Sequence, residues 1–169
     1  MKKSSLIIIF LVVFLDLVGF GIVIPILPYY AESFGASATS LAWLMVCYSG
    51  MQFLFSPFWG RCSDRIGRRP VLLTCIAGIA LSMLILGFAN SMLWLFIGRL
   101  LAGFFGANIS AASAYIADIT KPEERAKGMG LIGAAFGLGF LFGPAIGGYC
   151  SKWGYGTAAF VAAGLATYN

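Results

Sequence analysis

The sequence predicts an all-α integral membrane protein, and three observations support that fold class. Sixty per cent of the 169 residues are hydrophobic, ten per cent are charged and the mean hydropathy is +0.93, far from the values of a soluble domain. Apolar runs of roughly 20 residues recur along the chain, and a helix of that length crosses a bilayer. Short segments that hold most of the Arg and Lys residues separate these runs, as in loops between membrane spans.

The first span is expected at about residues 6–27, where Pro25 and Pro28 would close the helix. Lys2 and Lys3 precede this run, as they would in a signal peptide. The run is too long for a signal sequence, however, and no small-residue cleavage site follows it. We therefore expect this segment to remain in the protein as a membrane span.

The later spans follow from the remaining apolar runs. Four are expected at about residues 41–59, 70–89, 93–116 and 128–150. Residues 157–169 begin a sixth apolar segment, which is shorter than the roughly 20 residues needed to cross a bilayer. We expect five complete transmembrane helices plus the start of a sixth, and we interpret residues 1–169 as a truncated N-terminal transmembrane domain.

The basic residues indicate the orientation of the chain in the bilayer. Arg and Lys are retained on the cytoplasmic side, and a cytoplasmic N-terminus puts nine of the eleven bases there. These nine are Lys2, Lys3, Arg61, Arg65, Arg68, Arg69, Lys121, Arg125 and Lys127. Only Lys152 is expected outside, while Arg99 lies within a span. The pattern predicts a multi-pass protein, surrounded by lipid, with its N-terminus in the cytoplasm.

Composition excludes several classes of function. The bases gather in short loops instead of forming a stripe on a soluble face, so we expect no nucleic-acid partner. The chain has no His and its four cysteines show no C-x-x-C spacing, so we expect no metal site and no cofactor. The sequence offers no nucleophile–base constellation either, so we do not expect an enzyme.

Asp16 and Arg99 are the ionisable residues that lie deepest in the expected spans. A charge at the bilayer centre costs about 2.5–3.5 kcal/mol on insertion scales, so such residues face a cavity or a partner. The two side chains reach each other if their helices adjoin, and an acid that responds to a nearby Arg suits proton coupling. The alternatives are a purely structural ion pair, or an Arg99 that snorkels outward alone.

Gln52 is the other polar side chain considered within a span. A glutamine in lipid seeks a hydrogen-bond partner on a neighbouring helix. We interpret it either as a possible substrate contact or as an interhelical hydrogen bond.

The stretch from Gly60 to Leu73 reads GRCSDRIGRRPVLL and concentrates charge between two apolar spans. We expect a short cytoplasmic loop, with Pro70 in the first turn of the next helix. Its spacing G-x-x-x-D-R-x-G-R-R resembles the loop between helices 2 and 3 of the major facilitator superfamily of secondary transporters. The resemblance implies a cytoplasmic gate contact formed by Gly60, Asp64, Arg65, Gly67, Arg68 and Arg69. The alternative, a generic loop that sets orientation, needs the bases but neither the glycines nor Asp64.

Three further motifs extend the resemblance over essentially the whole chain. Arg99, followed by Gly103 and Gly106, is similar to the superfamily's fourth-helix motif. Asp16, followed by glycines and prolines, is similar to the first helix of drug–proton antiporters. The third motif resembles the fifth-helix GxxxGPxxGG sequence associated with antiporters and comprises Gly139, Gly143, Pro144, Gly147 and Gly148. These glycines and the proline permit either tight helix packing or bending.

The overall likeness is to tetracycline-efflux-type proteins, of which the chain resembles the N-terminal half. It implies proton-coupled efflux of a drug or another small amphipathic molecule across the inner membrane, at a site completed by a missing C-terminal half. In the third helix such proteins carry an acid where this chain has Ser82, which argues against tetracycline itself as the substrate. The alternatives are a proton-coupled metabolite symporter, which the antiporter-type motif disfavours, and a truncated membrane remnant that transports nothing.

Overall fold

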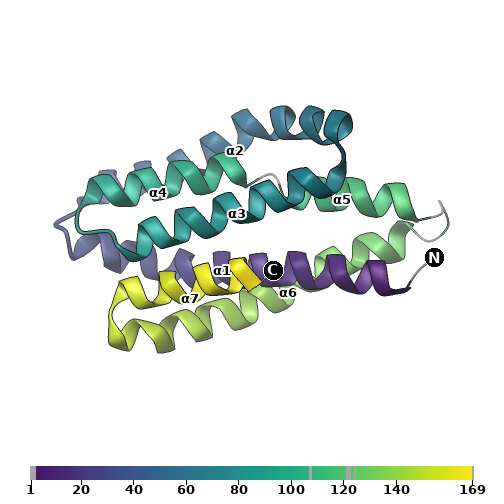
Figure 1. Cartoon of the computed structure of the whole chain (residues 1–169). Helices are drawn as coiled ribbons and strands as arrows, with labels where there is room; N and C mark the ends of the chain where they lie inside the picture. The colour runs from purple at the N-terminus through teal and green to yellow at the C-terminus, as the bar shows by residue number, and fades with distance from the viewer. Residues whose placement is uncertain (1–2, 107, 121–122, 124, 169) are drawn as a thin grey trace.

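The structure is a computed structural model that describes residues 3–106, 108–120, 123 and 125–168. These residues form a bundle of α-helices (Figure 1). In chain order the elements are α1 (Lys3–Glu32), α2 (Ala38–Ile66), α3 (Arg68–Gly87), α4 (Met92–Phe105), α5 (Asn108–Ile119), α6 (Arg125–Cys150), the 3-10 turn η2 (Ser151–Trp153) and α7 (Tyr155–Tyr168). No strand occurs in the described part of the chain, and the all-α fold class is confirmed.

The helices pack in two groups that lie side by side (Figure 1). In one group α1 packs along α6 and also contacts α7, while α2, α3 and α4 make up the other group. Helix α3 joins the groups because it packs against α7. The beginning of α1, the end of α2 and the end of α5 all lie at the same end of the bundle (Figure 1).

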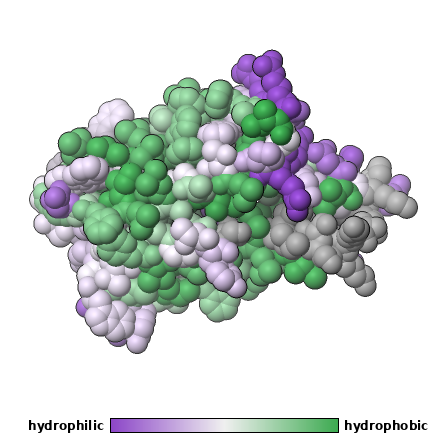
Figure 2. All heavy atoms as spheres, viewed as in Figure 1, coloured by the Kyte–Doolittle hydropathy of each residue, from purple (hydrophilic) through white to green (hydrophobic). Residues whose placement is uncertain are grey.

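Among the described residues, five helical stretches are long and apolar enough to cross a membrane. They are Phe10–Glu32, Ala38–Ile66, Arg68–Gly87, Met92–Ile119 and Arg125–Trp153. The shorter α7 covers the segment in which we expected a sixth span to begin. Figure 2 shows apolar atoms over most of the visible face, with hydrophilic atoms gathered where α2 meets α3. Exposed side chains such as Trp43, Phe53 and Leu54 suit a surface that contacts lipid.

Helix α1 continues past the two prolines that we expected to close it, so that boundary was wrong. Pro25 and Pro28 lie inside the helix, which runs on to Glu32 before Gly35 adopts a φ of +76°. Beyond the prolines, the hydroxyl of Tyr30 donates a hydrogen bond of 2.8 Å to the carbonyl of Ala89. This contact ties the last turns of α1 to the connection between α3 and α4, and such tertiary packing outweighs the backbone bonds that proline removes.

The stretch from Gly60 to Leu73, expected to be a loop, is helical on both sides of a single residue. Helix α2 extends to Ile66, α3 begins at Arg68, and Gly67 alone connects them. Gly67 has a φ of +100°, which favours glycine, and its N–H donates to the carbonyl of Ser63. A one-residue turn therefore takes the place of the expected loop.

The expected span at residues 93–116 is also not one continuous helix. Helix α4 ends at Phe105 and α5 begins at Asn108, while Gly106 caps α4 with its N–H bonded to the carbonyl of Gly103. Glycine is a poor helix former, which makes this a favourable place for an interruption. The two helices together still have the length and hydropathy of one membrane span.

Helices α1 and α6 approach each other closely because glycines line their contact. A Cβ added at Gly143 would lie 2.6 Å from the Cα of Gly21, and one added at Gly139 would lie 2.6 Å from the Cβ of Leu17. Gly147 lies similarly against Ile22. Small residues spaced four apart let helix backbones pack in this way inside a membrane. Three glycines of the antiporter-type motif thus allow α6 to pack closely against α1, whereas Gly148 has open space around it.

This packing makes Gly143→Ala a test of the α1–α6 contact. The added methyl group meets the backbone of α1, so we expect a loss of about 1–3 kcal/mol in unfolding free energy. Gly148→Ala is the matched control, since nothing lies within 4 Å of its Cβ and alanine improves helix propensity by up to about 1 kcal/mol. Thermal unfolding of both variants in detergent measures the difference, and equal midpoints would contradict the close approach.

Candidate functional site

A cavity of about 200 Å³ opens in the middle of the bundle, where both helix groups contribute side chains. Its polar side chains are Asp16 from α1 and Tyr48 and Gln52 from α2. Apolar residues of α1, α3, α4 and α6 complete the wall, among them Phe20 and Phe136. The cavity is therefore mainly apolar with a few polar groups converging on it, which is typical of sites for small organic molecules.

Asp16 is half-buried on α1 and lies on the cavity wall beside Leu17 and one turn before Phe20. Asp16 is the residue that contributes a carboxyl group to the lining of this cavity. The sequence predicted that Asp16 would face a cavity or a partner, and its position on the wall agrees with the first possibility.

Arg99 of α4 is 1 % exposed, and its Nε and Nη1 atoms have no hydrogen-bond partner among the described residues. Its guanidinium carbon lies 4.3 Å from the ring centroid of Tyr48. A desolvated cation–π contact of this kind contributes about 2 kcal/mol. Arg99 is thus enclosed in the bundle, and the alternative that it snorkels outward alone was wrong.

The structure does not join Arg99 directly to Asp16. Helix α1 packs mainly against α6 and α7, whereas α4 packs mainly against α2 and α3. Among the described residues, the ion pairs within 4 Å are both formed by Arg68. Tyr48 of α2 instead contacts Arg99 with its ring and lines the cavity together with Asp16. Tyr48 was not among the site residues predicted from the sequence, although its spacing of four residues from Gln52 places both on one face of a helix.

Gln52 forms a hydrogen bond between helices at the break in the fourth span. Its Nε2 donates to the carbonyl of Gly106 over 2.7 Å, and Trp59 Nε1 on the same helix donates to the carbonyl of Phe104 over 2.6 Å. A helix end has carbonyl groups without intrahelical partners, and a buried one needs donors from elsewhere. The interhelical role of Gln52 is thus observed, while its amide also lines the cavity.

Ser82, which stands where the resemblance implies an acid, is fully buried in α3. Its hydroxyl donates to the carbonyl of Ile79, 2.7 Å away. Ile79 and Met83 of the same helix line the cavity, but Ser82 is not one of its lining residues.

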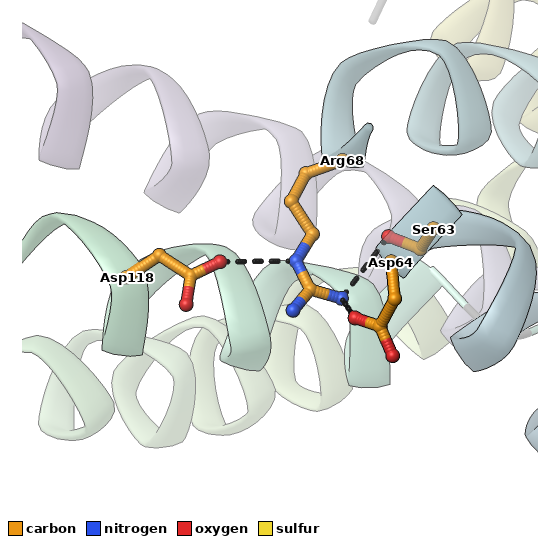
Figure 3. A network of polar contacts seen from close by, with 4 residues as sticks. All are labelled: Ser63, Asp64, Arg68 and Asp118. Atoms are coloured by element: carbon orange, nitrogen blue, oxygen red, sulfur yellow. Dashed lines mark hydrogen bonds and ion pairs between the residues drawn. The ribbon is translucent and has the colours of Figure 1, made fainter. Parts of the chain in front are cut away.

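A second cluster surrounds the guanidinium of Arg68, where α2 ends, α3 begins and α5 ends (Figure 3). Its Nη1 lies 2.7 Å from Asp64 Oδ1 and donates to Ser63 Oγ at 3.2 Å, while its Nε lies 3.0 Å from Asp118 Oδ2. Arg68 is 23 % exposed and the two carboxylates more than half, so each pair separately contributes only about 0–1 kcal/mol. Asp64, Arg68 and Asp118 together connect the ends of three helices, and these three residues form what we call the Arg68 cluster.

The Arg68 cluster contains two of the residues that the sequence motif singled out and one that it did not. Asp118 lies just after the expected span at residues 93–116, and in the structure it belongs to the last turn of α5. Arg65 and Arg69 are exposed at the same end of the bundle, and a Cβ added at Gly60 would meet no atom within 4 Å. A groove of about 410 Å³ runs beside the cluster between α2 and α5, lined by residues that include Gly60, Asp64 and Arg68.

Comparison with known proteins relates this arrangement of helices to a family. The family model described as Major Facilitator Superfamily matches residues 9–168. The chain belongs to this superfamily. The human organic anion transporter MFSD10 (TETRAN) has a similar solved structure, with a TM-score of 0.86 and 28% sequence identity. The match covers 99% of this chain and 47% of that transporter.

Curated superfamily relatives include drug resistance proteins of bacteria. The class B tetracycline resistance protein of Escherichia coli is 40% identical over 164 residues, which cover 95% of this chain and 41% of that protein. The class C protein of Escherichia coli is 44% identical over 87% of this chain and 38% of its own length. Multidrug resistance protein 2 of Bacillus subtilis (strain 168) is 33% identical over 98% of this chain and 42% of its length. The chain spans about two fifths of the length of these relatives.

Proposed function

We propose that the chain supplies the N-terminal helices of a secondary active transporter that exports a drug or another small amphipathic molecule in exchange for protons. The observation that carries this proposal is the cavity in the middle of the bundle, where Asp16 and Gln52 stand among apolar side chains. Similarity to tetracycline and multidrug resistance proteins supports the direction of transport and the class of substrate. Ser82 in place of an acid leads us not to propose tetracycline itself.

Proton coupling is assigned to Asp16, with Arg99 as the fixed positive charge of the same region. A carboxyl group binds one proton reversibly, and Asp16 lines the cavity in which substrate would bind. Loss of the negative charge on protonation changes which conformation of the bundle is favoured, so proton binding and substrate binding become linked. Gln52 is assigned as a substrate contact because it lines the same cavity.

The other half of the site is assigned to a C-terminal set of helices. Superfamily transporters bind substrate near the bilayer midplane at the interface of two repeats. The relatives are more than twice as long as their match to this chain, which leaves room for a second half. In this proposal the complete transporter lies in the bacterial inner membrane, with lipid around the helices and the N-terminus in the cytoplasm.

Asp16→Asn in the complete transporter tests the coupling. It should abolish efflux driven by a pH gradient and leave substrate binding within about threefold, because an amide keeps the shape of the side chain but cannot carry the proton. Glu32→Gln, an exposed acid at the far end of the same helix, is the matched control. The measurement is proton movement after addition of substrate to proteoliposomes, at equal protein levels. Proton movement that persists in the Asn variant would show that the coupling acid lies elsewhere.

The Arg68 cluster is proposed as the cytoplasmic gate contact, together with Gly60, Arg65, Gly67 and Arg69. Its ion pairs join α2, α3 and α5, so a conformation in which these helix ends separate must break them. Asp64→Asn should reduce transport about two- to fivefold, since an exposed ion pair contributes up to about 1 kcal/mol to the state that contains it. Arg61→Gln, an exposed base on the same helix, is the control, and normal efflux by the Asn variant would remove Asp64 from the gate.

Orientation is tested with single cysteines introduced into a cysteine-free version of the protein. Arg65→Cys and Arg125→Cys, exposed at one end of the bundle, should resist a membrane-impermeant maleimide in intact cells, and Ser37→Cys at the other end should react. The basis is the retention of Arg and Lys in the cytoplasm. All three should react once the cells are broken open. The reverse pattern in intact cells would place the N-terminus outside.

A further inference from the structure

We propose that Tyr48 is a positioning residue of the cavity site, whose ring holds the buried guanidinium of Arg99 and links it to the region of Asp16. The role in transport rests on the proposed function, whereas the contact between Tyr48 and Arg99 does not. None of the superfamily motifs in the sequence includes this tyrosine, and only the folded structure brings it to Arg99.

The first step of the argument is the state of Arg99. The side chain is 1 % exposed, and two of its three nitrogen atoms have no hydrogen-bond partner in the part of the chain that the structure describes. A buried charge is unfavourable unless other groups compensate for the lost water. The ring centroid of Tyr48 lies 4.3 Å from the central carbon of this guanidinium. The electron-rich face of that ring is therefore the main identified compensation for the charge.

The second step is the placement of Tyr48, which three helices determine. Its ring centroid lies 5.2 Å from that of Phe20 on α1, one turn after Asp16. Its backbone carbonyl lies against Gly103 of α4, where any larger residue would collide with it. Arg99, Tyr48 and Phe20 thus form a continuous contact from α4 through α2 to α1, and this contact spans the helices that do not pack directly along each other.

The third step concerns the cavity, because Tyr48 lines it together with Asp16. A molecule in the cavity touches the same ring that covers Arg99. Displacement of the ring would uncover the guanidinium beside the cavity that Asp16 also lines. Tyr48 therefore connects occupation of the cavity with the buried cation. The ring face matters for this role and the hydroxyl does not, which separates the effects of two substitutions.

The experiment compares Tyr48→Phe, which keeps the ring, with Tyr48→Leu, which removes it, in the complete transporter. In proteoliposomes Tyr48→Phe should retain kcat within about twofold, while Tyr48→Leu should lower kcat about tenfold or more with a smaller change in KM. Tyr149 is the matched control, because its exposed ring lies 5.2 Å from Lys152 Nζ and Tyr149→Leu should match Tyr149→Phe. Equal loss of kcat in both Tyr48 variants, from an active wild type, would overturn the inference.

A stability cycle tests the contact without transport. Tyr48→Leu should lower the thermal midpoint relative to Tyr48→Phe, and this difference should disappear when Arg99→Met removes the charge. If Tyr48→Leu is not recovered from the membrane, recovery of the double variant Tyr48→Leu with Arg99→Met supports the inference, and failure of both contradicts it. A Leu–Phe difference that persists without Arg99 also contradicts it. If the wild-type transporter moved no protons, the proposed function would be overturned instead. The stability cycle would still show whether Tyr48 and Arg99 interact.

Discussion

A polypeptide in hydrocarbon must satisfy its backbone hydrogen bonds internally, and the structure of this chain depends on that constraint. Helices meet it along nearly the whole described length, with connections as short as the single residue Gly67. The interruption between α4 and α5, inside the fourth span, meets it differently. There Gln52 and Trp59 of α2 donate to carbonyl groups of Gly106 and Phe104, so the break is stabilised by side chains of a neighbouring helix. Such a break is tolerated in a membrane where protein surrounds it or where it lines a cavity, and Gly106 does both.

The attraction between helices in lipid comes from close packing, because the hydrophobic effect does not favour one apolar neighbour over another. The contacts of Gly143 with Gly21 and of Gly103 with the Tyr48 backbone have this character. Both contacts also place functional candidates. The first brings α6 and Phe136 to the cavity that Asp16 lines, and the second brings Arg99 of α4 over the ring of Tyr48. Glycine motifs in this superfamily fold therefore position the polar groups that lie between the helices.

The two arginine centres occupy opposite environments, and this difference decides what each can do. Arg68 is at the end of the bundle with water nearby, bonded to two carboxylates on different helices. Its contacts are individually weak and easily exchanged, which suits a contact that forms in one conformation and breaks in another. Arg99 is enclosed, with an aromatic ring in place of an acid. A permanently charged group held in this way acts as a fixed source of potential for nearby side chains.

The sequence by itself determined the fold class, the number of membrane-spanning stretches and the residues worth attention. It did so because the length of an apolar run and the position of charges along the chain determine which segments cross a bilayer and in which orientation. Asp16, Arg99, Gln52 and Arg68 all stood out as polar or charged groups in apolar surroundings. Prolines and charge density were poorer guides to helix ends, since tertiary contacts carried α1 past Pro28 and α2 through Asp64.

Only the tertiary structure decided which of these residues meet. Asp16 and Arg99 can pair if their helices adjoin, but those helices pack mainly against other partners. Tyr48 contacts Arg99 and lines the cavity together with Asp16. Asp118 reads as part of a loop, yet the end of α5 brings it to Arg68. Pairings of this kind depend on which helix faces pack together, and that follows from the fit of many side chains over the whole bundle. No local pattern of charge, spacing or hydropathy contains that information.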